Sequence, residues 1–495
     1  MSELQDLSSL VRSNTPLIVI ETPDEARVVD LFRHILTNVW RALYRWSITE
    51  GMRRVDLDRE DAPETPPDIS ATLQAIKLHD QRGIYLLLDA TPYLGYAGTQ
   101  RMLREILERR GSLEHTVVLV GNKIELPLEL EALAVRFSLK LPDENALLKM
   151  MQDEVGLYQR ENSGRRVEVD KAALALVVRN LRGLALGEAR RIARQLIFRD
   201  GAIGENDLPE LAKLKFELLN KSGHLHFEYD TARFSDIAGL DRLKKWIKQR
   251  REVFVSGEAP VGLDPPKGIL LLGVQGCGKS LAAKAIAAGL GVPLVRLDFG
   301  TLYNKFHGET EKNLRDALTS AEQLAPCVLW MDELEKGLAS SGGDEDGGVS
   351  RRVLGYFLTW MAERTSRVFL VATANAVQQL PPELLRKGRF DEIFFVDLPD
   401  AAARGLIFQL HMDKRKVDWS GFSLASLADA SAGFSGAEIE QVVVSALYAA
   451  HADRVPVDEA RLLAEIAGTR PLSVLMSEQV SGLRHWAATR TVPAD

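Results

Sequence analysis

The stretch GILLLGVQGCGKSLAAKAI, residues 268–286, decides the fold of this chain. It opens with a short apolar run that is typical of a buried parallel strand. It closes with an alanine-rich segment that favours a helix. Between them, Gly273 to Ser280 read Gly-x(4)-Gly-Lys-Ser, a phosphate-binding loop. A simple glycine-rich turn before a helix is the alternative, but it would not need this spacing between these flanks.

Each residue type in the loop has a chemical reason. Glycines let the backbone curl so that its N–H groups face phosphate oxygens, and the helix that follows directs its positive end at them. Lys279 can place its charge on the β- and γ-phosphates, and the Ser280 hydroxyl can ligate Mg²⁺. ATP and Mg²⁺ are therefore the expected cofactors. The loop residues expected to contact the nucleotide are Gly273, Gln275, Gly276, Cys277, Gly278, Lys279, Ser280 and Leu281.

Length and composition limit the class of protein. A chain of 495 residues is too long for one core, so two to four domains are expected. Its 46% hydrophobic and 26% charged residues are ordinary for a globular protein. A net charge of −7 weighs against sequence-independent binding of nucleic acid, although a local basic patch remains an alternative. No apolar run approaches about 18 residues, so no membrane span is expected. Only two cysteines and no signal-peptide pattern predict a cytoplasmic protein without disulfides.

The two halves of the chain share an ordered set of short strings. GIYLLLDATPYL (83–94) precedes VVLVGNKIELPLELEALAVRFSLKLPD (117–143), and CVLWMDELEKGL (327–338) precedes VFLVATANAVQQLPPELLRKGRFDEIFFVDLPD (368–400). Both halves run strand-Asp, strand-Asn, Leu-Pro-x-Glu-Leu, Arg-Phe and Leu-Pro-Asp. We interpret them as two copies of one module, each a parallel α/β sheet followed by helices. Two unrelated α/β domains with similar apolar strings are the alternative.

The first copy has lost the chemistry of the second. Its loop after Ile20 reads ETPDEARV, without the glycines or the Lys-Ser pair, and Asp89 is followed by Ala90 instead of a glutamate. The predicted organisation is a degenerate module at 1–200 (with its sheet at 1–143 and its helical lid at 144–200), a linker at 201–232, a catalytic sheet domain at 233–400, a helical lid at 401–470 and a tail with a helix and a loose end at 471–495.

In the second copy, polar residues follow two apolar strands. Asp332 and Glu333 end the strand that begins near Cys327, and Asn375 ends the next strand. Such strand ends face the ligand crevice of a parallel sheet. Asp332 can hold Mg²⁺ through water, Glu333 can polarise the attacking water, and Asn375 can fix that water beside the γ-phosphate. A solvated acidic loop and an ordinary turn asparagine are the alternatives.

Six motifs together resemble one family. FSDIAGL (234–240), the phosphate loop, MDE, TAN, LLRKGRFDE (384–392) and GFSGAEI (433–439) occur in the order found in the AAA subgroup of the AAA+ ATPases. The fold expected from this resemblance is a tandem of P-loop NTPase modules. The whole chain more narrowly resembles the AAA ATPases of cyanobacteria and algal plastids, which join a degenerate amino-terminal AAA domain to an active carboxy-terminal one.

The resemblance implies further roles. It places Ile237, Ala238 and Gly239 against adenine, His411 near the ribose, Gly436 and Ala437 at the lid turn, and Arg386 and Arg389 as arginine fingers that act on a neighbouring subunit. Fingers of this kind require a ring, and six subunits is the usual number in the family. An ordinary surface histidine and a solvated basic turn are the alternatives for His411 and for the two arginines.

The resemblance also suggests contacts with a protein substrate. Lys305, Phe306 and His307 stand where the family has its first pore loop, and Ser340 to Gly348 where it has the second. An aromatic side chain on a loop at a ring axis can grip a polypeptide, although Phe306 could simply pack within its loop. Cys277 is interpreted as a small residue that fits the loop; the alternative is a redox-sensitive thiol whose pKa is lowered by the nearby helix amino terminus.

The function predicted from these residues is Mg²⁺-dependent hydrolysis of ATP by a ring of identical subunits that remodels or threads a protein partner. The alternative is an ATP-dependent switch or scaffold whose nucleotide state controls assembly without threading. A nucleic-acid motor is disfavoured by the acidic net charge.

Overall fold

The computed structural model describes residues 3–37, 39–56, 63–109, 115–204, 206–220, 223–229, 232–256, 260, 262–302, 309–338, 347–386 and 388–495. The chain folds into two compact units. One comprises Met1–Glu154 with Leu184–Ala193, and the other Val155–Gly183 with Arg194–Asp495. No helix among the described residues is long and apolar enough to cross a membrane.

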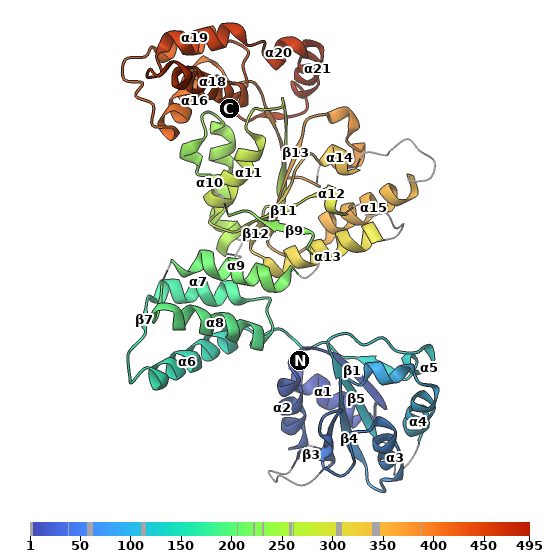
Figure 1. Cartoon of the computed structure of the whole chain (residues 1–495). Helices are drawn as coiled ribbons and strands as arrows, with labels where there is room; N and C mark the ends of the chain where they lie inside the picture. Colours follow the sequence, from blue (N-terminus) through green and yellow to red (C-terminus); the bar gives the residue numbers. More distant parts are fainter. Residues whose placement is uncertain are drawn as a thin grey trace. The chain divides into compact units, whose positions relative to one another are not determined.

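The first unit contains a largely parallel sheet (Figure 1). Its described strands number six, in the order β3-β2-β4-β5-β1-β6, and only the β2–β3 pair is antiparallel. The central strands are continuous apolar runs, as expected where helices cover both faces. The strands are β1 Leu17–Glu21, β2 Ala42–Ser47, β3 Gly51–Arg54, β4 Gly83–Leu88, β5 Thr116–Gly121 and β6 Ala134–Arg136.

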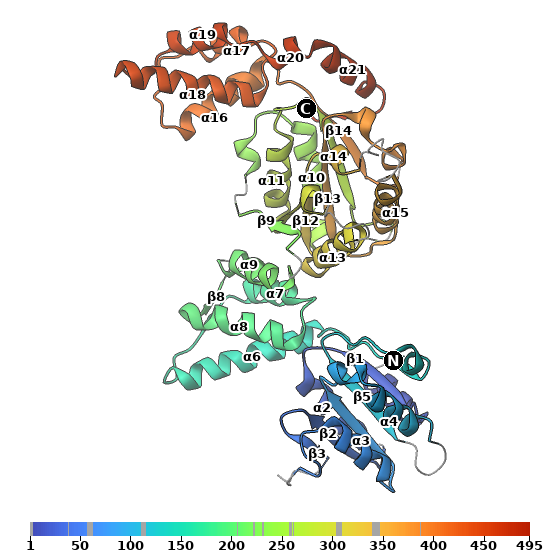
Figure 2. The same cartoon turned by 45° about the vertical axis from the view of Figure 1, so that its right-hand side comes forward.

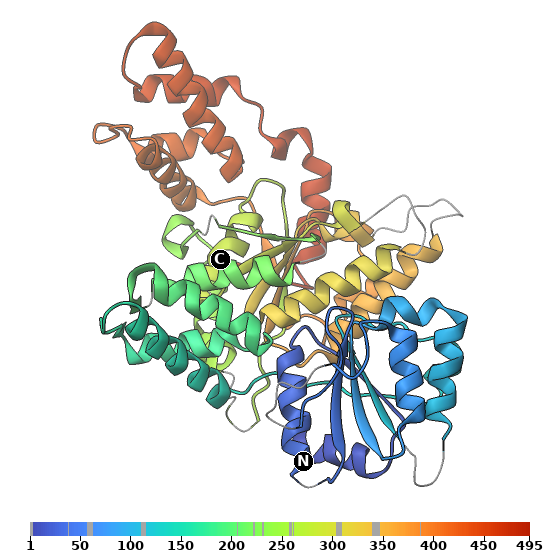
Figure 3. The same cartoon turned by 60° about the horizontal axis from the view of Figure 1, so that its bottom comes forward.

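Helices cover the two faces of this sheet because successive side chains of a strand point to opposite sides. In β1, Ile18 and Ile20 pack against α1 and α2, whereas Leu17 and Val19 pack against α3 and α4. Figure 3 shows these two helix pairs on either side of the strands. The helices are α1 Glu3–Arg12, α2 Glu25–Leu36, α3 Ile69–Leu78, η1 Thr91–Gly95, α4 Ala97–Leu107 and α5 Leu128–Glu131.

A helical segment follows the first sheet. It contains α6 Glu144–Glu161, β7 Glu168–Val169, α7 Lys171–Leu181, α8 Leu186–Asp200, β8 Ala202–Ile203, α9 Asp207–Leu219 and β9 Leu225–Phe227. The last two elements lie within the expected linker, yet both are integrated in the second unit. Helix α9 packs against α7 and α13, and its Leu211 and Phe216 side chains are buried; β9 pairs with β11.

The second unit carries the larger sheet (Figure 2). Its described strands number seven, in the order β15-β14-β10-β13-β12-β11-β9, and only β9 runs antiparallel to its neighbour. Strand β10, which opens the phosphate-binding stretch, lies between β13 and β14. The strands are β10 Gly268–Gly273, β11 Leu294–Leu297, β12 Cys327–Met331, β13 Val368–Ala374, β14 Glu392–Val396 and β15 Val492–Pro493.

The two faces of this sheet are covered by different helices. Ile269 and Leu271 of β10 pack with α10 and α11, whereas Leu270 and Leu272 pack with α13 and α15. Parallel sheets covered by helices in both units confirm the α/β class predicted from the sequence. The elements are η3 Phe234–Asp236, α10 Asp241–Ser256, α11 Lys279–Leu290, α12 Phe299–Leu302, α13 Glu309–Leu324, α14 Leu334–Leu338, α15 Gly347–Glu363, η4 Val377–Gln379 and η5 Pro382–Leu385.

Residues after the large sheet form a helical subdomain and a return to the sheet. The helices are α16 Ala401–Lys414, α17 Leu424–Ala430, α18 Gly436–Asp453, α19 Glu459–Gly468, α20 Leu472–Leu475 and α21 Ser477–Ala487. The first four share one apolar core. The expectation of a loose end is wrong, because β15 pairs with β14 and the Ala494 side chain is buried.

Candidate nucleotide site

The phosphate loop connects β10 to α11 through a turn that needs glycine. Gly276 and Gly278 adopt φ values of +78° and +87°, in the left-handed region that other residues rarely occupy. Gly273 is needed for a different reason, since a Cβ atom there would lie 2.0 Å from the Val396 carbonyl oxygen of β14. The loop is therefore packed tightly against the edge of the neighbouring strand.

Lys279 is the first residue of α11 and is buried. Its ammonium group folds back over the loop and donates to the carbonyl oxygens of Gly273 (2.9 Å) and Val274 (2.7 Å). Burial lowers the pKa of Lys279 to about 8, although nearby acidic groups oppose that shift. Ser280 and Leu281, the next residues of α11, are exposed. The loop thus has a buried cation at its centre and an accessible hydroxyl beside it.

The carboxyl end of β12 lies beside that of β13. The hydroxyl of Thr373 donates to the Asp332 carboxylate and accepts the backbone N–H of Glu333 at 3.0 Å. Glu333 adopts φ +49°, which is unfavourable for a residue with a side chain, so this contact stabilises the turn. The sequence analysis assigned no role to Thr373, although it begins the TAN motif, because its bond to the neighbouring strand depends on the tertiary structure.

The structure brings Glu333 and Asn375 together. The Asn375 amide Nδ2 lies 3.4 Å from Glu333 Oε1, and the Lys336 ammonium lies 2.6 Å from Glu333 Oε2. The Asn375 backbone N–H donates to Glu335 Oε1 at 2.9 Å. Glu335 is only 2% exposed, and its Oε2 has no hydrogen-bond partner among the described residues. Glu335 was missed, although the run Asp-Glu-Leu-Glu contained the signal.

The helical subdomain contacts the phosphate loop directly. The Ala437 backbone N–H donates to the Gly276 carbonyl at 3.1 Å, and a Cβ at Gly276 would meet the Ser435 hydroxyl at 2.9 Å. Ser435 also caps α18, in a reciprocal arrangement with Glu438. The expected lid turn, Gly436 and Ala437, therefore lies on the loop.

Comparison with known proteins agrees with this geometry. Residues 269–398 match the model of the ATPase family associated with various cellular activities (AAA). Residues 3–139 and 145–222 match the N-terminal and second domains of the SpoVK-like AAA ATPases. The chain is 34% identical to the AAA domain-containing protein ycf46 of Trieres chinensis, over 98% of this chain and 96% of that one.

The chain belongs to the AAA ATPase family. The ycf46 protein of Guillardia theta is also 34% identical, over 99% of this chain and 95% of its own length. A cell division cycle protein 48 homolog of Archaeoglobus fulgidus is 33% identical over 43% of this chain and 30% of its own. The chain is accordingly an ATPase, and the predicted resemblance to algal-plastid AAA proteins is confirmed.

In this AAA ATPase, the turn at Ile237 to Gly239 lies along α11. Ile237 is buried in the apolar cluster that contains Ala282 and Ile286 of that helix. Cys277 lies at the margin of the same cluster, and burial raises the pKa of its thiol to about 12. The idea of a lowered thiol pKa is therefore wrong, because desolvation of the thiolate outweighs the charge of neighbouring Lys279.

The remaining predicted residues either contact other parts of the second unit, are exposed, or lie outside the described residues. His411 is half-buried in α16 beside Arg415 and Glu440, and burial lowers its pKa. Arg386 is exposed, and the Arg389 guanidinium donates to the Leu358 carbonyl of its own subunit. Lys305, Phe306, His307 and most of Ser340 to Gly348 lie outside the described residues.

The first unit has a comparable parallel sheet but lacks the phosphate loop. In the first sheet, Glu21 pairs with Gly121, the residue before Asn122. In the second sheet, Leu272 pairs with Ala374, the residue before Asn375, so Glu21 and Leu272 occupy equivalent positions. Three residues instead of six then lead to the helix, so Glu25 opens α2 where Lys279 opens α11. Asp24 accepts from the Arg27 N–H and so caps the helix end with its own carboxylate.

The second strand end corrects the sequence alignment of the two copies. Alternate residues of each strand face the same side of its sheet. Leu88 lies on the side covered by α2, and Trp330, two residues before Asp332, lies on the corresponding side covered by α11. Leu88, not Asp89, therefore corresponds to Asp332. Asp89 takes the place of Glu333 and has the same φ of +49°. Burial and the Asp89 charge raise the pKa of Glu25. The first module thus presents carboxylates where the second presents a lysine.

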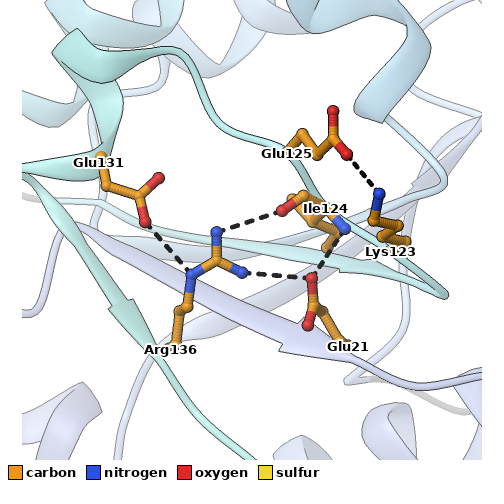
Figure 4. A network of polar contacts seen from close by, with 6 residues as sticks. All are labelled: Glu21, Lys123, Ile124, Glu125, Glu131 and Arg136. Carbon is orange, nitrogen blue, oxygen red and sulfur yellow. Dashed lines mark hydrogen bonds and ion pairs between the residues drawn. The ribbon is translucent and has the colours of Figure 1, made fainter. Parts of the chain in front are cut away.

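A polar network closes the same edge of the first module (Figure 4). Glu21 Oε1 accepts from the Ile124 backbone N–H at 2.9 Å and from Arg136 at 3.2 Å. Arg136 also donates to the Ile124 carbonyl (3.2 Å) and to Glu131 (3.3 Å), while Lys123 pairs with Glu125. Arg136 is therefore committed to protein partners around the strand end.

Proposed function

We propose that this AAA ATPase works as a ring that uses Mg²⁺-ATP hydrolysis to remodel or thread a protein partner, and that hydrolysis is confined to the second module. The observation that carries the hydrolytic step is the arrangement of Glu333 and Asn375 at adjacent strand ends. Both lie in the module that also holds the buried Lys279 within a glycine loop. A lysine ammonium inside a glycine loop, next to the amino terminus of a helix, is suited to bind a polyphosphate once it leaves its carbonyl partners.

The residues fit Mg²⁺ as well as ATP. Asp332 is held by Thr373, and Ser280 is exposed on the first turn of α11, so a carboxylate and a hydroxyl are available as hard oxygen ligands. Bound Mg²⁺ would neutralise charge on the β- and γ-phosphates. Lys279 would bind the same oxygens after it leaves the Gly273 and Val274 carbonyls.

Glu333 would act on the attacking water. Its carboxylate accepts a proton as the water oxygen bonds to the γ-phosphorus and the bond to the β-phosphate oxygen breaks, which gives ADP and phosphate. Asn375 would hold the water and the carboxylate in one geometry, since its amide already lies 3.4 Å from Glu333 Oε1. The positions of Asn375 and Glu335 are linked through the Asn375 N–H.

The variant Glu333→Gln tests this assignment. The glutamine keeps the shape of the Glu333 side chain and an oxygen that can face the Asn375 amide, but it cannot accept a proton. ATP should therefore still bind, while turnover falls by at least about 10²-fold. Glu363→Gln, an exposed residue at the end of α15, is the matched control and should hydrolyse ATP normally. Normal turnover by Glu333→Gln would remove the proposed role.

The ring and the threading rest on Arg386, Arg389 and Phe306. An arginine supplied by a neighbouring subunit can raise turnover by roughly 10³–10⁵-fold, so the isolated subunit should be nearly inactive. Phe306→Ala separates threading from a nucleotide-dependent switch. A threading enzyme should lose processing of its protein partner and keep its basal ATPase, whereas a switch should keep its basal ATPase and its effect on its partner.

A further inference from the structure

The turn between η3 and α10 has a backbone conformation that requires outside support. Gly239 and Leu240 both adopt left-handed φ values, +69° and +61°. Glycine does so without cost, but a leucine disfavours this region because its Cβ approaches the following carbonyl oxygen. A turn with such a residue persists where neighbouring contacts determine its shape.

Those contacts come from residues 492–495, which we call the C-terminal clamp. The Asp495 carboxylate accepts the Leu240 backbone N–H, and the Ala494 carbonyl accepts the Leu243 N–H at 3.1 Å. Ala494 is 1% exposed and belongs to the same apolar cluster as Ile237 and Leu240. A Cβ at Gly239 would lie 2.5 Å from Asp495 Oδ1, so the carboxylate sits directly on the turn.

The clamp is anchored to the strand that supports the phosphate loop. Val492 and Pro493 pair with Phe394 and Phe395 of β14, and the Ala494 N–H donates to the Phe395 carbonyl at 3.0 Å. The next residue of β14, Val396, accepts from the Val274 N–H of the phosphate loop at 3.3 Å. Strand β14 therefore contacts the phosphate loop directly and supports the turn before α10 through the clamp.

We propose that Asp495 is a positioning residue that fixes the turn at Ile237 to Gly239 and thereby sets the affinity of the site for the adenine base. The inference rests on the proposed nucleotide site, in which this turn faces the base. Among the described residues, the clamp hydrogen-bonds to Leu240, Leu243 and β14, none of which is assigned to the phosphates, so its loss should weaken binding of a nucleotide and leave binding of inorganic triphosphate unchanged.

The test is calorimetric titration of the full chain with ATP and with inorganic triphosphate, each with Mg²⁺. Asp495→Ala should raise the Kd for ATP about tenfold, the effect of one lost hydrogen bond to a charged acceptor, and change the Kd for triphosphate less than about twofold. Asp495→Asn retains an acceptor oxygen and should bind ATP nearly as the parent does. Glu478→Ala, exposed on α21, is the control.

The outcomes separate the two proposals. An unchanged ATP Kd in Asp495→Ala, or equal losses for ATP and triphosphate, would overturn the positioning role. A second variant, Gly239→Ala, pushes the carboxylate away and should give the same base-dependent loss if the role is correct. Lys279→Ala should abolish binding of both ligands. If it does not, the proposed nucleotide site itself is wrong, whatever Asp495→Ala shows.

Discussion

The most quantitative prediction concerns Lys215, a buried lysine of α9. Its side chain is 3% exposed, and its ammonium donates to the Arg182 carbonyl at 2.7 Å. Burial lowers the pKa of Lys215 from 10.5 to about 8. At pH 7 the folded protein must therefore bury a charged ammonium. This burial lowers the free energy of unfolding by about 3 kcal/mol, because each pKa unit corresponds to about 1.4 kcal/mol.

The sign of the pH effect follows from this lowered pKa. Between pH 8 and 10.5 the unfolded chain binds more protons at this site than the folded one, so stability rises with pH through that window. Below pH 8 both states are protonated and the full penalty applies. By about pH 10 the penalty falls to about 1 kcal/mol, since most of the deprotonation in the folded state has already occurred.

Lys215→Met removes the penalty but also removes the hydrogen bond from Lys215 to the Arg182 carbonyl, which costs about 1–2 kcal/mol. The variant should be about 1–2 kcal/mol more stable than the parent at pH 7, a rise of a few degrees in Tm. At pH 10 it should be equal or less stable. Lys248→Met, exposed on α10, should show neither effect. A variant that is destabilised equally at pH 7 and pH 10 would refute the reasoning.

Three further predictions concern the site. Glu335→Ala should lower kcat by about 10–10²-fold with little change in ATP affinity, because the Asn375 N–H loses its acceptor. Steady-state kinetics would measure the change in kcat, and a binding assay would measure the ATP affinity. Cys277 should react slowly with a thiol reagent at pH 7.5, and its serine variant should keep most ATPase activity, whereas rapid labelling would contradict the raised pKa. Lys279→Ala should abolish binding of a fluorescent ATP analogue to the whole chain, because Asp24 and Glu25 occupy the helix start of the first module; residual stoichiometric binding would show that this module takes nucleotide.

The central strands could be predicted from the sequence because they are buried on both faces. LIVI, IYLLL and GILLL are continuous apolar runs, and each is a strand. Strands β2 and β3 were not predicted, because ALYRWS and GMRR are only half-buried and mix polar with apolar residues. Strand β15 could not be predicted either, since its pairing with β14 depends on a partner about a hundred residues earlier.

The sequence predicted the site residues that directly follow buried strands. Glu333 and Asn375 were found because polar residues directly follow apolar runs, and the structure places them together. Thr373 and Glu335 act from buried positions, which residue type alone does not reveal. The pKa of the Cys277 thiol could not be predicted for the same reason. The sequence shows how close Cys277 lies to the helix amino terminus, but the desolvation of its thiol depends on the tertiary structure.

The most direct test of the account is the ATPase rate per subunit as a function of protein concentration, with particle mass recorded on Glu333→Gln in ATP. The proposed ring mechanism, in which Arg386 and Arg389 act on the neighbouring subunit, predicts a rate that rises with concentration and a variant that assembles into a closed ring. A monomer with a concentration-independent rate would contradict it and would favour a nucleotide-dependent switch over a ring motor.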